Sequence, residues 1–110
     1  MTAQIQVADK VHVVDDDLAL RDSLSVLLDA HGFQVSTYEN AEQFLKKLDQ
    51  EASGCVLIDV NMPGMSGIDL LAELKGRGIP LPCIVMTGAG QVSLAVKAMK
   101  TGAADFLEKP

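Results

Sequence analysis

Acidic residues end two short apolar segments of this chain. Val11–Val14 is followed by the run Asp15–Asp17, and Cys55–Ile58 is followed by Asp59. Carboxylate oxygens are ligands for hard cations such as Mg²⁺. Two carboxylates ~4 Å apart at an effective dielectric of ~20 repel by roughly 4 kcal/mol, so such a cluster needs a cation or takes up protons. The pattern predicts a cation site in which one carboxylate can act as a nucleophile toward phosphorus.

Two more polar residues lie at the ends of predicted strands later in the chain. Thr87 follows Cys83–Met86, and Lys109 follows Asp105–Glu108. Phosphoryl transfer needs an in-line nucleophile and neutralisation of charge on the phosphoryl oxygens. A hydroxyl can donate a hydrogen bond to those oxygens, a lysine supplies a cation, and Gly88 leaves the site open. The residues expected to converge are Asp15, Asp16, Asp59, Thr87 and Lys109.

The elements that must position these residues alternate between strand and helix. Apolar periodicity and turn residues predict strands at 10–14, 34–38, 55–58, 83–86 and 105–108, with helices at 18–30, after Asn40, after Ser66 and at 92–100. Alternating strands and helices form parallel sheets with right-handed crossovers. We therefore expect an α/β, flavodoxin-like, doubly wound five-stranded sheet of order 2-1-3-4-5. Its ligand site should lie beyond the carboxyl ends of the strands.

Helical periodicity also predicts which helix positions face the core. In the helix at 92–100 these are Val92, Ala95, Val96 and Met99, and the helix at 18–30 has a leucine stripe that includes Leu27. The chain ends at Pro110, before the usual fifth helix of this topology. We therefore expect an exposed apolar patch on the sheet face that carries the first helix, or self-association that covers it.

Bulk composition narrows the class of protein. The chain has 110 residues, which is one domain by length, and a net charge of −6 from 9 basic and 15 acidic residues. This balance argues against binding of nucleic acid or of an anionic membrane by this segment. No signal peptide is recognisable, so a cytoplasmic protein is expected. Cys55 and Cys83 are expected to be reduced core residues.

Four polar residues near these motifs have simpler explanations. Asp17 is expected to cap the helix that begins at Leu18. Arg21 is expected to lie on the solvated surface. No function is expected for His12 or His31.

The motifs resemble those of the receiver domain of two-component response regulators. The matching segments are Val13–Asp17, Ile58–Gly67, Val85–Gly88 and Asp105–Pro110. They span nearly the whole chain in the family's order. The details are most similar to the branch with a C-terminal helix-turn-helix output domain that regulates transcription, so residues 1–110 would be a receiver domain without its output domain.

The resemblance implies a role for each acidic residue. Asp59 would be the phosphoacceptor. Asp16, Asp59 and the backbone carbonyl of Asn61 would bind Mg²⁺ or Mn²⁺ directly, and Asp15 would act largely through water.

It also implies how a phosphoryl group would be held and sensed. Thr87 and Lys109 would contact the phosphoryl oxygens. Phe106 would occupy the aromatic switch position, and the Lys109–Pro110 bond would be cis.

The implied partners and activity follow. A sensor histidine kinase would donate the phosphoryl group, and a homodimer would form through the face of the fourth helix and fifth strand or through the uncovered face. The protein would not be an enzyme, beyond catalysing its own phosphorylation and dephosphorylation.

Three alternatives remain on the residues alone. A Mg²⁺-dependent phosphatase with an aspartate nucleophile commonly needs an aspartate two positions later, where this chain has Asn61. An interaction module that is never phosphorylated would not need the complete set of acids, Thr87 and Lys109. A flavodoxin-like cofactor carrier would need a phosphate-binding loop where this chain has carboxylates.

Overall fold

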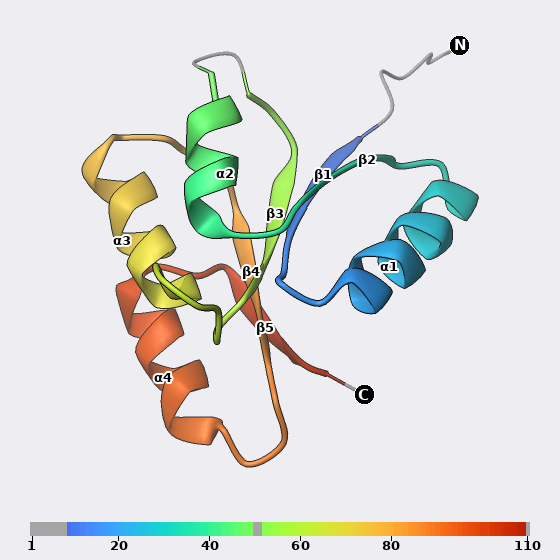
Figure 1. The fold of residues 1–110 in the computed structure, drawn as a ribbon. Coiled ribbons are helices and arrows are strands. Elements are labelled where there is room, and N and C mark those ends of the chain that lie inside the picture. Colours follow the sequence, from blue (N-terminus) through green and yellow to red (C-terminus); the bar gives the residue numbers. More distant parts are fainter. Residues whose placement is uncertain (1–8, 50–51, 110) are drawn as a thin grey trace, which may run out of the picture.

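Residues 9–49 and 52–109 are described by the structure, which is a computed structural model. They form one five-stranded sheet in the order β2-β1-β3-β4-β5, with all neighbouring strands parallel (Figure 1). This confirms the predicted fold. The strands are β1 (Lys10–Val14), β2 (Gln34–Tyr38), β3 (Cys55–Asp59), β4 (Cys83–Thr87) and β5 (Asp105–Glu108), and the helices are α1 (Leu18–Ala30), α2 (Ala41–Lys47), α3 (Gly67–Gly76) and α4 (Val92–Thr101).

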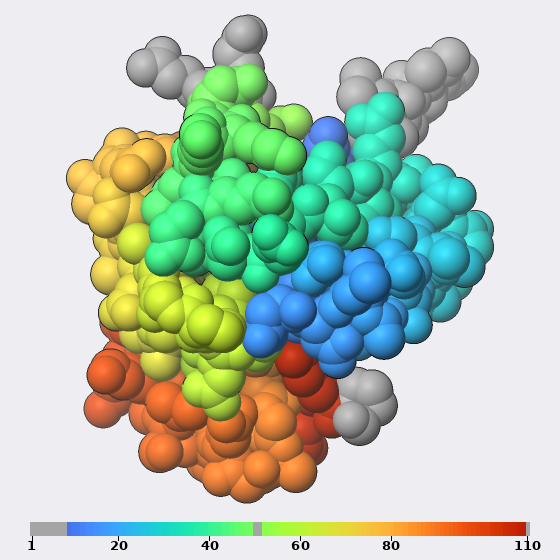
Figure 2. Space-filling model, in the orientation of Figure 1, coloured from blue at the N-terminus to red at the C-terminus, as the bar shows by residue number. Residues whose placement is uncertain are grey.

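The helices cover the two faces of the sheet unequally. Helices α2, α3 and α4 lie on one face and α1 lies on the other (Figure 1). Alternate strand residues therefore enter two separate apolar clusters. The larger contains Phe44, Ile58 and Leu70, and the smaller packs Val13 against Leu24 of α1. In the space-filling view, α1 forms one flank and the other helices form the opposite flank (Figure 2).

Side-chain caps set where three of the helices begin. Asp17 accepts a hydrogen bond from the backbone nitrogen of Ala19 at 2.9 Å, as predicted for α1. Asn40 caps α2, and Ser66 forms a capping box with Asp69 at the start of α3. These bonds satisfy backbone donors that a helix leaves unpaired. The loops that precede α1 and α3 follow directly from the ends of β1 and β3.

The predicted inward stripe of α4 is largely wrong. Ala95 is buried as expected, but Val92 is 72% exposed, and Val96 and Met99 are also exposed. The small residue Ala98 packs into the core instead. Helix α4 thus packs against the core through Ala98 and the partly buried Leu94, whereas its other large apolar side chains remain exposed.

The α1 face of the sheet is only partly covered. Leu27, predicted to face the core, is 54% exposed, whereas Leu24 and Leu28 do pack into the smaller cluster. Leu107 of β5 is also exposed, and its pairing with Met86 places it on the α1 face. The predicted exposed apolar surface is therefore present on this face.

The cysteines belong to opposite faces of the sheet. Cys83 is buried in the larger cluster and Cys55 contacts the smaller one, and both thiols are free as predicted. Among the described residues, no helix combines the length and the apolar character needed to cross a bilayer.

Candidate functional site

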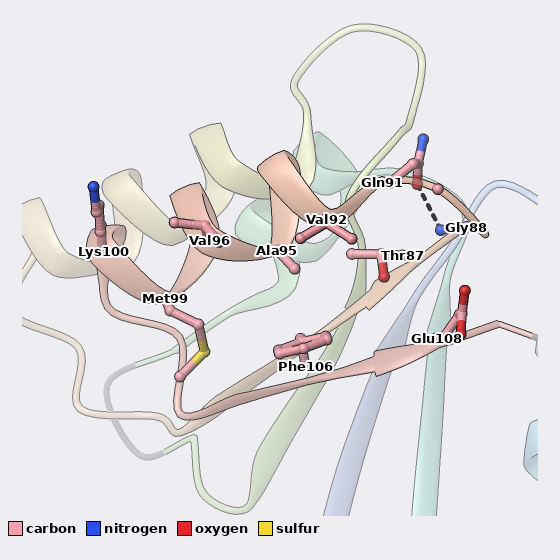
Figure 3. Close-up of a pocket in the computed structure, with 11 residues that line it drawn as sticks. Thr87, Gly88, Gln91, Val92, Ala95, Val96, Met99, Lys100, Phe106 and Glu108 are labelled. Atoms are coloured by element: carbon pink, nitrogen blue, oxygen red, sulfur yellow. Dashed lines mark hydrogen bonds between the residues drawn. The ribbon is translucent and has the colours of Figure 1, made fainter.

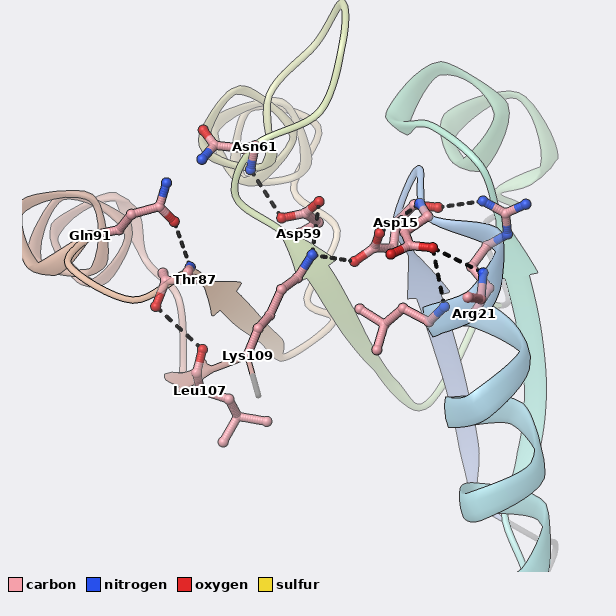
Figure 4. A network of polar contacts seen from close by, with 12 residues as sticks. Asp15, Arg21, Asp59, Asn61, Thr87, Gln91, Leu107 and Lys109 are labelled. Carbon is pink, nitrogen blue, oxygen red and sulfur yellow. Dashed lines mark hydrogen bonds and ion pairs between the residues drawn. The ribbon is translucent and has the colours of Figure 1, made fainter.

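The carboxyl ends of four adjacent strands meet at one edge of the sheet (Figure 4). Asp15 follows β1, Asp59 ends β3, Thr87 ends β4 and Lys109 follows β5. The first three of these side chains are buried, and β2, the outer strand, contributes none of them. The structure therefore brings together strand ends that are far apart in the sequence.

Three carboxylates are grouped within this edge. One oxygen each from Asp15, Asp16 and Asp59 lies within 4.8 Å of the others. Asp15 and Asp59 are buried, whereas Asp16 is exposed at the mouth of the group. Oδ2 of Asp15 is buried, and its contact is with the ammonium of Lys109. A group of three carboxylates at one edge of the sheet fits a hard divalent cation.

Lys109 connects the two buried acids. Its Nζ lies 2.9 Å from Oδ2 of Asp15 and 3.2 Å from Oδ2 of Asp59, and its side chain is 24% exposed. The backbone nitrogen of Lys109 donates to the carbonyl of Thr87 at 2.7 Å, which holds the lysine against the end of β4. The Lys109 ammonium is thus shared by two carboxylates, so the group of acids retains excess negative charge.

This environment changes the pKa of both Asp59 and Lys109. Burial, with the charge of Asp15, raises the pKa of Asp59 to about 6, against the opposing effects of the Asn61 backbone N–H and Lys109. Burial alone would lower the pKa of Lys109, but its contacts with Asp15 and Asp59 outweigh burial and raise it. The lysine therefore stays charged, and Asp59 becomes a carboxylate near neutral pH.

Arg21 supports the turn that carries the acids. Its Nη1 donates to the backbone carbonyl of Asp15 at 2.7 Å, and the Asp15 side chain accepts from the backbone nitrogen of Asp17 at 2.8 Å. The prediction that Arg21 is solvated surface was therefore wrong. A long basic side chain in the first turn of a helix that follows an acidic turn was the signal available in the sequence.

The remaining predicted site residues lie nearby in different orientations. Asn61 donates its backbone N–H to Oδ1 of Asp59 at 3.2 Å, and its side chain is exposed. The hydroxyl of Thr87 donates to the carbonyl of Leu107 at 3.4 Å and not to Asp59 (Figure 4). Phe106 is 44% exposed. The predicted cis bond before Pro110 lies outside the described residues.

Comparison with known proteins assigns the family. Residues 11–110 match the family described as the response regulator receiver domain. This chain belongs to that family. The receiver-domain resemblance of the sequence is thereby confirmed, and receiver domains are signalling proteins and not enzymes in the ordinary sense.

Two relatives in the family are named as regulatory proteins, one of them as a transcriptional regulator. The chain is 53% identical over 100 residues to the transcriptional regulatory protein FixJ of Bradyrhizobium diazoefficiens, which covers 91% of this chain and 49% of the relative. It is 41% identical over 103 residues to the response regulator protein TodT of Pseudomonas putida, covering 94% of this chain and 45% of that protein. The chain thus spans about half the length of the curated relatives it matches.

Solved receiver-domain structures have the same fold. The crystal structure of FixJ-N superposes with a TM-score of 0.89 at 44% identity, covering 96% of this chain and 84% of that one. Full-length FixJ from B. japonicum also gives a TM-score of 0.89, at 50% identity, covering 96% of this chain and 52% of that one.

Proposed function

We propose that this receiver domain is a switch that accepts a phosphoryl group on Asp59 from a sensor histidine kinase. The observation that carries the proposal is the position of Asp59 Oδ2, 3.2 Å from Lys109 Nζ and grouped with two further carboxylates. A carboxylate can attack phosphorus when the charge of the phosphoryl oxygens is neutralised. Lys109 and a bound cation would together supply that neutralisation.

The candidate cation site would hold Mg²⁺ or Mn²⁺, because both ions prefer oxygen ligands. Its ligands would be the side chains of Asp15, Asp16 and Asp59 and the backbone carbonyl of Asn61. The grouping of these three carboxylates beside the Lys109 ammonium, which leaves excess negative charge, supports this assignment. When bound, the ion would offset negative charge on the phosphoryl oxygens.

In the proposed transfer, each bond that forms is matched by a bond that breaks. An ionised oxygen of Asp59 forms a bond to phosphorus while the bond from phosphorus to the histidine nitrogen of the kinase breaks, and the imidazole takes up a proton as it leaves. Lys109 stays beside Asp59 and neutralises the transferred group. Attack of water on phosphorus later breaks the acyl phosphate and returns the Asp59 carboxylate with inorganic phosphate. The chain would thus promote only its own modification and its reversal.

Thr87 and Phe106 would convert this modification into a change of shape. In the structure the Thr87 hydroxyl contacts the Leu107 carbonyl. A phosphoryl group adds about two negative charges and strong acceptor oxygens beside it, which would draw the hydroxyl away from β5. Phe106, half exposed on the neighbouring strand, would then move inward. The two arrangements form a two-state element that the acyl phosphate biases.

The output would involve the exposed apolar surface between α4 and β5. Val92, Val96 and Met99 extend from α4 above Phe106 of β5 and line a groove of about 310 Å³ (Figure 3). An apolar groove of this kind suits a second copy of the chain, and the uncovered α1 face is the alternative dimer surface. Residues 1–110 would then be the receiver domain of a longer transcription regulator, in keeping with the names and lengths of its relatives.

Incubation with acetyl phosphate and Mg²⁺, followed by intact-mass measurement, tests the proposal. The chain should gain one phosphoryl group, Asp59→Asn should gain none, and Asp22→Asn, which changes an exposed acid of α1, should behave as wild type. Absence of the mass gain in wild type would instead support an unphosphorylated interaction module. Steady hydrolysis of an unrelated phosphomonoester would indicate the phosphatase.

A further inference from the structure

The loop between β4 and α4 is closed by the side chain of Gln91. Its Oε1 accepts a hydrogen bond from the backbone nitrogen of Gly88 at 2.5 Å, and its own backbone nitrogen donates to the Gly88 carbonyl at 3.2 Å (Figure 3). These two bonds join the ends of the segment 88–91. The loop that follows Thr87 is therefore closed into a small ring by two hydrogen bonds between Gly88 and Gln91.

This use of a helix-capping position differs from the rest of the molecule. Asp17, Asn40 and Ser66 each accept from the first turn of the helix that they precede. Gln91 directly precedes α4, yet its side chain caps no backbone donor of α4 in the described structure. Its acceptor is directed backward to the loop, so the bond constrains the loop and leaves the helix end without this support.

The ring adjoins the candidate site. Met86 is paired with Asp59, so the N–H of Gly88 lies just beyond that pair at the same edge of the sheet. The neighbouring Thr87 hydroxyl points toward Leu107 in this arrangement. A phosphoryl group on Asp59 would bring charged oxygens to this edge, and these accept hydrogen bonds more strongly than a neutral carboxamide. The bond from Gly88 to Gln91 would then compete with the phosphorylated arrangement.

We propose that Gln91 is a positioning residue that holds the loop after Thr87 in its unphosphorylated arrangement. This inference rests on the proposed phosphorylation of Asp59. The carboxamide keeps the Gly88 N–H occupied until a charged acceptor displaces it, and so sets part of the free-energy difference between the two arrangements. Removing the carboxamide favours the phosphorylated arrangement, and strengthening the acceptor opposes it.

The size of the effect follows from the kind of bond. A neutral hydrogen bond present in only one of two states shifts their ratio by roughly two- to tenfold. Gln91→Ala removes the acceptor, and Gln91→Glu supplies a charged one. Gln43 offers a matched control, because its Oε1 likewise accepts from a backbone nitrogen, that of Glu39 at 2.9 Å, in the loop before α2.

Two measurements on wild type, Gln91→Ala, Gln91→Glu and Gln43→Ala test the proposal. The first is the hydrogen-exchange rate of the Gly88 amide without phosphodonor. The second is the half-saturating concentration of beryllium trifluoride, a mimic of the phosphoryl group, with Mg²⁺. In Gln91→Ala we expect faster Gly88 exchange and a half-saturating concentration roughly two- to tenfold lower. Gln91→Glu should change both values in the opposite direction, and Gln43→Ala should change neither.

The outcomes separate this inference from the function on which it depends. Unchanged Gly88 exchange in Gln91→Ala, or faster exchange with an unchanged half-saturating concentration, overturns the role of Gln91 while wild-type binding still supports the switch. If wild type neither binds beryllium trifluoride nor takes up phosphoryl groups, the proposed function itself fails, and the role of Gln91 fails with it.

Discussion

Gly67, the first residue of α3, lies directly against the backbone carbonyl of Asp59. A Cβ atom at Gly67 would overlap that carbonyl oxygen and would lie 2.9 Å from both Cγ2 of Ile58 and Cα of Val60. The backbone nitrogen of Gly67 also donates to the Val60 carbonyl at 3.2 Å. The start of α3 therefore helps to fix the end of β3, where the candidate phosphoacceptor lies.

Gly67→Ala should destabilise the fold and displace Asp59. Overpacking of a closely packed site costs roughly 1–3 kcal/mol in the free energy of unfolding, because backbone atoms must shift. Gly76→Ala in the same helix is the control, since a Cβ there meets nothing within 4 Å and should stabilise the helix by roughly 0.5–1 kcal/mol. Urea unfolding measures both, and equal effects of the two variants would contradict this account.

Lys109→Met should destabilise the metal-free protein. Asp15 and Asp59 would lose the cation that they share, and an uncompensated buried charge costs roughly 1–3 kcal/mol or more. Added Mg²⁺ should recover part of this loss, because it offsets the same charge. Thermal unfolding with and without Mg²⁺ measures the effect. Lys97→Met, which changes an exposed lysine of α4, is the control and should leave the melting temperature nearly unchanged.

The pKa of Asp59 predicts a pH dependence of stability. Its folded value of about 6 lies above its ordinary value of 3.8, so the folded state holds this proton more tightly than the unfolded state. In the absence of metal, wild type should therefore gain stability relative to Asp59→Asn as the pH falls from 7 toward 4. Urea unfolding of both proteins across this range measures the difference. A constant difference would show that Asp59 is not perturbed.

The effect of His12 on the pH dependence of stability should be opposite to that of Asp59. It is buried, and its ring nitrogens lie 3.0 Å from the Tyr38 hydroxyl and 3.0 Å from the Ser53 carbonyl. Burial, with the nearby charge of Lys10, lowers the pKa of His12 below 6.5, although the bond to Ser53 opposes this.

The folded state therefore favours neutral His12, whose stabilising contribution is complete above pH 6.5 and is lost as the pH falls through its lowered folded pKa. His12→Gln should remove this loss. The stability of wild type relative to His12→Gln should fall on acidification, as measured by urea unfolding at each pH. If the stability of wild type and that of His12→Gln change in parallel with pH, this role for His12 is ruled out.

The apolar surface of α4 should mediate dimer formation after phosphorylation. Val96→Glu places a charge in the groove beside Phe106 and should weaken a dimer formed there, because the carboxylate would be desolvated. Sedimentation in the presence of beryllium trifluoride and Mg²⁺ measures the dimer fraction. Val26→Glu, on the exposed surface of α1, is the matched control and should have no effect. Undiminished dimer formation by Val96→Glu would point to the α1 face instead.

The sequence by itself determined the order of the elements and which polar residues end the strands. Short continuous apolar runs and helical periodicity identify strands and helices locally, and capping residues such as Asp17 mark where helices begin. In a parallel sheet the carboxyl ends of neighbouring strands share one edge. Residues at the ends of predicted strands, such as Asp15, Asp59 and Lys109, could therefore be assigned to one site without coordinates.

Only the tertiary structure decided how these parts meet. Periodicity shows which side of α4 is apolar, but not that the helix approaches the sheet through Ala95 and Ala98 and leaves Val92 exposed. The contacts of Arg21 with the Asp15 carbonyl and of Gln91 with Gly88 depend on the paths of turns and on side-chain rotamers. A local pattern records the preference of a segment for apolar or polar surroundings, whereas packing distances between segments determine which atoms touch.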